Sequence, residues 1–167
     1  MKTSKTTIIE INKKKIGNEQ PVYIIAEIGI NHNGSLEIAK KLIDVAVVAK
    51  VDAVKFQKRD INSLYKEDVL KNPNIDSQGL EILLNVLNEV EFNNSDYEKI
   101  IQYCNDSGIT FLCTAWDKKS VDFLEKFNIP AYKIASADLT NFPLIQYICE
   151  KNKPLIVSTG MSTMDEI

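Results

Sequence analysis

Five short apolar segments recur along the chain, and each one leads directly into polar residues. Segments with helical spacing of apolar residues lie between them, and this alternation is typical of a parallel sheet covered by helices. Polar residues at successive strand ends favour a TIM (β/α) barrel, in which functional residues lie at the carboxyl ends of the strands. Because a closed barrel of this type has eight strands, we expect a barrel truncated after about five of them. The predicted strands are residues 22–28, 52–57, 109–114, 131–135 and 155–157.

The residues before the first of these strands form a separate pattern. Residues 7–11 and 15–16 are strand-like and flank a polar turn, which predicts an N-terminal β-hairpin. We therefore expect residues 1–21 to form a hairpin cap and residues 22–167 to form the partial barrel.

Capping residues predict where several helices begin. Ser35 can cap the first helix, and Ser95 can open another in which Glu98 completes a capping box. Asn141, followed by Pro143, predicts a further helix start. Three other segments are predicted more coarsely: a long polar loop over residues 58–76, a leucine-rich helical stripe over residues 80–87, and a helix beginning in residues 163–167.

The composition argues against several classes of partner. Twenty basic and 23 acidic residues give a net charge of −3, which offers no electrostatic reason to bind nucleic acid. No apolar run approaches the length of a membrane span. The three cysteines are odd in number and widely spaced, so they predict neither a disulfide framework nor a zinc site. We expect a cytoplasmic protein that binds neither nucleic acid nor membrane.

Charged residues within the strands predict a binding site. Lys55 and Lys133 lie in apolar strand contexts, where a charge must find a partner. Two ammonium groups that converge on one pocket would suit a phosphate or a carboxylate, and hydroxyl groups can complete such an anion site. The alternative is that each lysine pairs with a carboxylate at a strand end. The hydroxyl groups at the strand ends belong to Thr114, Ser136, Ser158 and Thr159.

Other polar residues allow more than one interpretation. Glu27 could act as a general base, grip substrate hydroxyl groups or pair with a neighbouring lysine. His32 is the only histidine, so this chain alone provides no multi-histidine metal site, and the side chain could either stabilise a loop or contact substrate. Asn31 is predicted to be a turn residue, while Gln57 is predicted to point inward beside Lys55. Asp117 is predicted to be a helix N-cap.

Four ordered motifs resemble the sialic acid synthase family, which includes the N-acetylneuraminate synthases and their legionaminic and pseudaminic acid relatives. The resemblance covers nearly the whole chain from about residue 22 onward, and residues 138–141 (DLTN) add to it. Residues 113–117 read CTAWD where many members have STPFD, so the threonine is retained while the pocket wall differs. The four motifs are residues 26–34 (AEIGINHNG), 54–57 (VKFQ), 132–136 (YKIAS) and 158–161 (STGM).

The resemblance implies a reaction and a set of roles. Family members are TIM barrels that condense phosphoenolpyruvate with an N-acetylated hexosamine, such as N-acetylmannosamine, to give a nine-carbon 2-keto acid and phosphate. It implies that Glu27 lies at the acceptor-sugar site, and that Asn31, His32 and Gln57 are possible sugar or loop contacts. A divalent metal, typically manganese, would polarise the sugar aldehyde. The residues that match phosphoenolpyruvate ligands are Lys55, Thr114, Lys133, Ser136 and Ser158.

The resemblance also places parts of the enzyme outside this chain. The two metal-binding histidines, the last three strands and a carboxy-terminal antifreeze-like domain are expected beyond residue 167, so the chain itself would hold no metal. We therefore expect the isolated chain to have little or no synthase activity. Two alternatives stay open: a Schiff-base (class I) aldolase that uses Lys133 as its amine nucleophile, and a non-catalytic half that needs a carboxy-terminal partner chain. A homodimer is also possible by resemblance.

Overall fold

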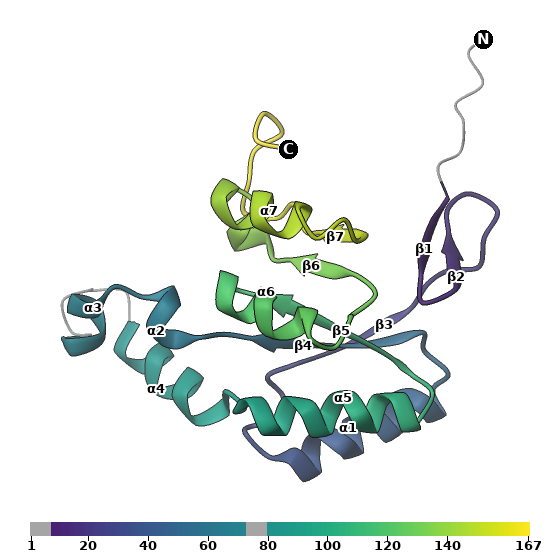
Figure 1. Ribbon diagram of the computed structural model, residues 1–167, viewed down its shortest axis with the longest axis horizontal. Coiled ribbons are helices and arrows are strands. Elements are labelled where there is room, and N and C mark those ends of the chain that lie inside the picture. The colour runs from purple at the N-terminus through teal and green to yellow at the C-terminus, as the bar shows by residue number, and fades with distance from the viewer. Residues whose placement is uncertain (1–7, 73–79) are drawn as a thin grey trace.

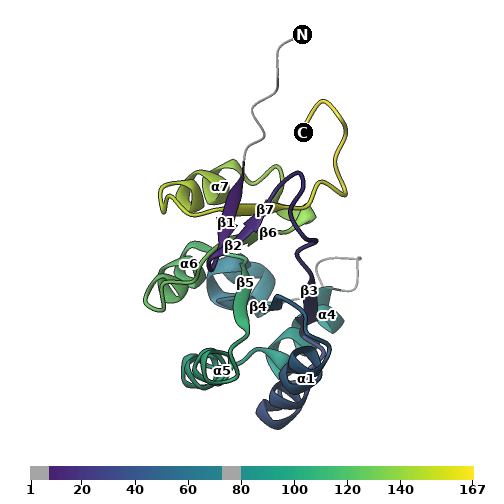
Figure 2. The same ribbon diagram turned by 90° about the vertical axis from the view of Figure 1, so that its right-hand side faces the viewer.

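The computed structural model describes residues 8–72 and 80–167. Its main sheet has five parallel strands in the order β3-β4-β5-β6-β7, which is also their order along the chain. In Figure 2 the strands follow a curve, and helices lie along its outer side. This is the α/β architecture predicted from the strand–helix repeat, with four successive β/α units of a barrel followed by a fifth strand. The strands are β3 (Ile25–Gly29), β4 (Ala53–Lys58), β5 (Thr110–Ala115), β6 (Tyr132–Ile134) and β7 (Leu155–Val157).

Helices follow the strands and cover one face of the sheet (Figure 1). Alternation along each strand sends one set of apolar side chains toward these helices. Val54, Phe56 and Cys113 belong to this set and are fully buried with Ile43 and Ile100. The Cys113 thiol therefore packs against the helices and does not face the strand-end site. The covering helices are α1 (Leu36–Val48), α5 (Asn94–Asp106), α6 (Lys118–Glu125) and α7 (Phe142–Cys149).

The predicted N-terminal hairpin is confirmed. Strands β1 (Ile9–Ile11) and β2 (Lys14–Ile16) pair antiparallel, with Ile9 opposite Ile16. Ile11 is 2% exposed and packs with a second, smaller cluster on the other face of the sheet. The Asn12 side chain donates a 2.9 Å hydrogen bond to the hydroxyl of Thr110, the first residue of β5. The hairpin thus covers the amino-terminal end of the strands, and the second cluster contains Ile11, Ala53, Leu112 and Ala131.

Most predicted helix starts agree with the structure, with one exception. Ser35, Asp117 and Asn141 each accept a hydrogen bond from a backbone N–H in the first turn of their helices. The predicted start at Ser95 is wrong, because Asn93 is the N-cap of α5. Asn93 accepts from the Asp96 N–H at 3.0 Å and its amide donates to the Asp96 carboxylate at 2.7 Å, a reciprocal pair that starts the helix earlier.

Two other coarse predictions need correction. The segment predicted as a long loop contains two short helices, α2 (Ile61–Leu64) and α3 (Glu67–Lys71), while its last residues lie outside the described ranges. Neither helix has a buried residue, so the sequence contains no apolar period that would reveal them. The helix predicted from residue 163 is a turn, in which Thr163 N–H donates to the Glu166 carboxylate at 2.7 Å. Met164 is 83% exposed, so this segment has no buried face to stabilise a helix.

The leucine-rich stripe forms α4 (Leu80–Val90), as predicted. Its buried positions are Leu84, Leu87 and Val90, whereas Leu83 is 47% exposed. Over the described parts of the chain, no helix is both long enough and apolar enough to cross a membrane.

Candidate anion-binding site at the strand ends

The centre of the candidate site is Lys55 on β4. Its ammonium lies 2.9 Å from the Glu27 carboxylate and donates a 2.9 Å hydrogen bond to the Thr114 hydroxyl. Parallel pairing sets Glu27 beside Lys55, so the register of β3 and β4 creates this ion pair. The Lys55 side chain is 8% exposed and that of Glu27 is 53% exposed. The lysine-pairing alternative for Glu27 is what the structure shows, and much of the carboxylate still faces solvent.

Lys133 on β6 is the second ammonium of the site. It pairs in register with Thr114, and its Nζ donates to the Ile134 carbonyl at 2.7 Å. Burial lowers the pKa of Lys133, repulsion from Lys55 lowers it further, and Glu27 opposes both effects. The pairing alternative fails for this residue: within residues 8–72 and 80–167, no carboxylate forms an ion pair with Lys133. The site therefore has two ammonium groups, and only that of Lys55 has an ion-paired carboxylate among the described residues, which favours an anionic ligand.

The two predicted serines lie at the same end of the sheet. Ser136 opens a 3-10 turn, η2 (Ser136–Asp138), directly after β6. Ser158 follows β7, and its N–H donates to the Ile134 carbonyl at 3.1 Å. A Cβ placed on Gly160 would lie 3.5 Å from the Ser136 Cβ, so the segment after Ser158 passes close to Ser136. The structure thus brings both hydroxyl-bearing segments to the strand ends that carry the lysines.

Gly29 separates Glu27 from Gln57. Its φ angle is +55°, a region that favours glycine. A Cβ at this position would lie 3.0 Å from the Glu27 Oε1 and 3.1 Å from the Gln57 Nε2. The predicted inward orientation of Gln57 therefore places its amide on the same side as the Glu27 carboxylate.

Asn31 and His32 contact the loop that follows β3. The Asn31 amide donates to the Ile28 carbonyl at 2.8 Å, and His32 Nδ1 accepts from the Gly34 N–H at 3.2 Å. His32 is 1% exposed, and its ring stacks on Phe92 with centroids 4.0 Å apart. Of the two alternatives for His32, the structure shows the loop-stabilising one, and the buried ring presents almost no surface to a ligand.

His32 predicts a pH dependence of stability. Burial lowers its pKa from 6.5 to about 4, so the folded chain binds this proton only well below the pH at which the unfolded chain does. The contribution of neutral His32 to the free energy of unfolding is fully present above about pH 6.5 and is lost as the pH drops toward 4. At pH 5 the loss is about 2 kcal/mol. Urea unfolding at pH 7 and pH 5 measures this loss. Because His32 is the only histidine, His32→Gln should remove most of the difference in the free energy of unfolding between pH 7 and pH 5. If the variant shows the same difference as the wild type, the assignment to His32 is wrong.

Sequence reasoning missed a buried ionic cluster beside the site. Lys58 and Arg59 are each 7% exposed, and both lie 3.7 Å from carboxylate oxygens of Glu91. Burial raises the pKa of Glu91, and the two cations oppose that rise. The Tyr97 hydroxyl donates to Glu91 at 3.3 Å and to the Gln57 carbonyl. Lys58 is the last residue of β4 and Arg59 follows it directly, whereas the sequence predicts that this strand ends at residue 57.

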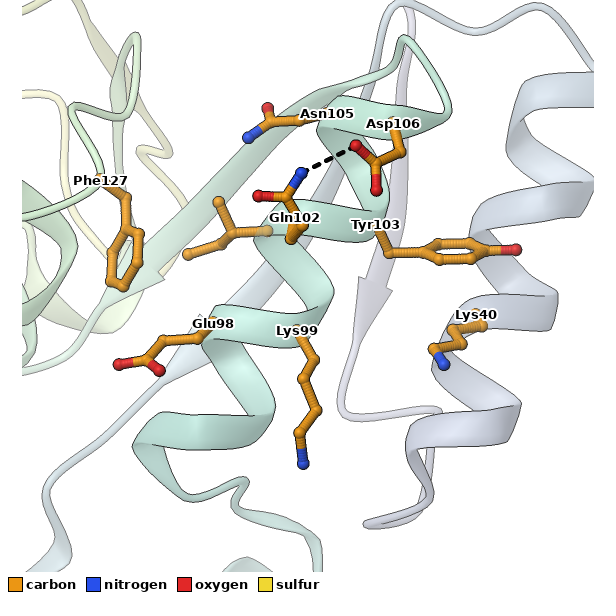
Figure 3. Close-up of a pocket in the computed structure, with 9 residues that line it drawn as sticks. Lys40, Glu98, Lys99, Gln102, Tyr103, Asn105, Asp106 and Phe127 are labelled. Atoms are coloured by element: carbon orange, nitrogen blue, oxygen red, sulfur yellow. Dashed lines mark hydrogen bonds between the residues drawn. The ribbon is translucent and has the colours of Figure 1, made fainter.

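Cavities occur both near and far from the strand ends. A groove of about 540 Å³ lies on the outer helices and is lined by Lys40 of α1 and by residues of α5 such as Lys99 and Tyr103 (Figure 3). It is on the helical side of the molecule, away from the candidate site. A second cavity, of about 380 Å³, lies beside the strand ends. Its lining includes Leu64, Trp116, Asp117, Asn141 and Pro143.

A divalent metal does not fit the described residues by themselves. Among residues 8–72 and 80–167, no group of three or more His, Cys, Asp or Glu side chains is placed to hold a metal ion. Glu27, the carboxylate of the candidate site, already pairs with Lys55.

Comparison with known proteins identifies the family. The model of the NeuB family matches residues 42–167, which is more than half of the chain. Human N-acetylneuraminate-9-phosphate synthase is 32% identical over 151 residues, covering 90% of this chain and 42% of that protein. N,N'-diacetyllegionaminic acid synthase of Legionella pneumophila is 35% identical over 162 residues, covering 92% of this chain and 44% of that protein.

A solved structure supports the same assignment. The crystal structure of N-acetylneuraminic acid synthetase from Leptospira borgpetersenii, in complex with citrate, superposes with a TM-score of 0.83 at 29% identity. The superposition covers 97% of this chain and 53% of that one. The chain thus spans about half the length of the relatives it matches. Its sequence, its sheet and the order of its motifs agree with one another, and the chain belongs to the NeuB family.

Proposed function

We propose that this chain carries the phosphoenolpyruvate-binding part of a sugar acid synthase. The reaction would join phosphoenolpyruvate to an N-acetylated hexosamine, giving a nine-carbon 2-keto acid and phosphate. The named relatives are synthases of N-acetylneuraminate-9-phosphate and of diacetyllegionaminic acid, which supports this class of reaction. These two relatives are named for different products, so the proposal covers the class of N-acetylated hexosamines and not one particular sugar.

One observation carries the proposal: two lysines lie at the strand ends, and in the described part of the chain only Lys55 has a carboxylate as its ion-pair partner. Lys55 is held by Glu27 and Thr114, and the pKa of Lys133 is lowered by burial and, in addition, by repulsion from Lys55. A phosphate or carboxylate placed between the ammonium groups would relieve this repulsion through charge-assisted hydrogen bonds. Phosphoenolpyruvate carries both groups. We assign its binding to Lys55, Thr114, Lys133, Ser136 and Ser158.

Glu27 is assigned to the acceptor sugar. Its carboxylate is 53% exposed and lies opposite the Gln57 amide across Gly29, so hydroxyl groups of a sugar could reach both. We propose that the divalent metal, manganese by resemblance, binds ligands other than the side chains of residues 8–72 and 80–167.

Calorimetric titration of the purified 167-residue chain tests the binding assignment. Phosphoenolpyruvate is expected to bind more tightly than pyruvate, because pyruvate lacks the phosphate that the second ammonium would hold. Equal affinities, or no binding of either compound, would contradict the assignment. With manganese and N-acetylmannosamine added, we expect little or no phosphate release from this chain alone. Robust turnover would show that the chain is sufficient for catalysis.

Lys133 also supports a second candidate. Its lowered pKa would suit an amine nucleophile, so the Schiff-base alternative stays a prediction. Borohydride trapping of a substrate adduct on Lys133 would favour this alternative, and the anion-binding role predicts no adduct. The proposal of a partner chain that completes the barrel stays open as well, since β3 and β7 are the outer strands of the described sheet.

A further inference from the structure

Arg59 is a buried cation that no part of the proposed anion site uses. Its guanidinium carbon lies 4.6 Å from the centre of the Trp116 ring, and its Nη1 lies 3.7 Å from Glu91 Oε2. Its backbone N–H donates to Glu91 Oε1 at 3.1 Å. With 7% of its surface exposed, the side chain is held by an aromatic face and a carboxylate, and its freedom to reorient is small.

Glu91 is itself held firmly. It follows the end of α4 and precedes Phe92, whose ring stacks on His32. Lys58 and the Tyr97 hydroxyl contact its Oε1 at 3.7 Å and 3.3 Å. The segment between α4 and α5 therefore supplies a fixed anchor for the guanidinium.

The remaining polar contact of Arg59 is with Gln57, where Arg59 Nη2 donates to Gln57 Oε1. A guanidinium has donors and no acceptor, so it must face the oxygen of the amide and not its nitrogen. Gln57 Nε2 is consequently turned the other way. It lies 3.1 Å from the place where a Cβ of Gly29 would stand, and Glu27 Oε1 lies 3.0 Å from the same point.

We infer that Arg59 is a positioning residue that fixes the orientation of the Gln57 amide. The amide then presents its N–H donors beside the exposed Glu27 carboxylate, which can only accept hydrogen bonds. The pair offers one donor and one acceptor to the oxygen atoms and hydroxyl groups of a bound substrate. This inference deepens the proposed function, and its substrate part rests on that function.

Nuclear magnetic resonance of the 15N-labelled chain tests the inference without any ligand. The Gln57 side-chain amide is identified by its loss in Gln57→Glu. In the wild type we expect a nuclear Overhauser effect between this amide and the Gly29 α protons. Arg59→Met should clearly weaken that effect, because nothing then distinguishes the two amide orientations and the N–H groups face Gly29 only part of the time. Arg59→Lys keeps the buried charge but loses the planar fork, and it should weaken the effect if the methionine variant does not fold.

A control variant and a titration with ligand distinguish the positioning role of Arg59 from the proposed function. Lys119→Met removes a cation whose side chain is 67% exposed, and it should leave the Overhauser effect of the Gln57 amide unchanged. If the Overhauser effect keeps its full strength in both Arg59 variants, the positioning inference is wrong. Phosphoenolpyruvate or N-acetylmannosamine is then added to the wild type. If the Gln57 signals respond to Arg59 substitution but no signal at Lys55 or Thr114 responds to these compounds, the proposed function fails while the positioning inference stands.

Discussion

Lys55→Met is expected to weaken the binding of phosphoenolpyruvate by roughly 30-fold or more. Truncating one partner of a buried, hydrogen-bonded charge pair costs about 2–5 kcal/mol, and each 1.4 kcal/mol corresponds to about tenfold in affinity. Lys55 would meet these conditions in the complex, because its side chain is 8% exposed, donates to Thr114 and would pair with the bound anion. Its removal would also leave the Glu27 carboxylate without its cation, and this negative charge would repel the incoming anion.

The same substitution should change folding stability little. The Glu27 side chain is 53% exposed and can be hydrated once its partner is gone, while methionine fills the volume of the lysine stem. Thermal unfolding of the variant separates a loss of binding from a loss of fold. Lys99→Met is the matched control, because Lys99 is 55% exposed on α5 and lines the groove of Figure 3. Equal affinities of Lys55→Met and Lys99→Met for phosphoenolpyruvate would refute the assignment.

Gly34→Ala is expected to destabilise the fold by roughly 2–4 kcal/mol. Gly34 has a φ angle of +72°, and a residue with a Cβ in this region costs about 1–2 kcal/mol. The added Cβ would also lie 2.5 Å from the backbone oxygen of Glu89 in α4, so the loop or the helix must move. That movement would disturb the stacking of His32 on Phe92 and the anchor that Glu91 provides.

Gly108→Ala isolates the backbone part of this effect. Gly108 has nearly the same φ angle, +71°, but a Cβ there would meet no atom within 4 Å. It should therefore cost only the conformational penalty of about 1–2 kcal/mol. Urea unfolding of both variants provides the comparison. If Gly34→Ala is no more destabilising than Gly108→Ala, the close approach of the loop to α4 adds nothing to the cost of a side chain at residue 34.

The predicted fold and the predicted site depended on different kinds of information. Alternation along 52–57 predicts that Gln57 points inward beside Lys55, and the structure agrees, with Val54 and Phe56 buried on the opposite face. Local capping patterns located Ser35 and Asn141 correctly. They failed at Ser95 because two cap candidates, Asn93 and Ser95, lie close together, and the choice depends on the contact between Asn93 and Asp96.

The sequence by itself determined the strand–helix repeat and the face to which each strand residue points, because side-chain alternation is a local property of the backbone. Only the tertiary structure decided which charges meet. Lys55 pairs with Glu27 through the register of β3 and β4, and Arg59 meets Glu91 across 32 positions of the chain. His32 became a core residue because Phe92 from a distant segment covers it. Contacts of this kind depend on strand register and sheet curvature, which place distant residues side by side and which no periodicity within a single segment records.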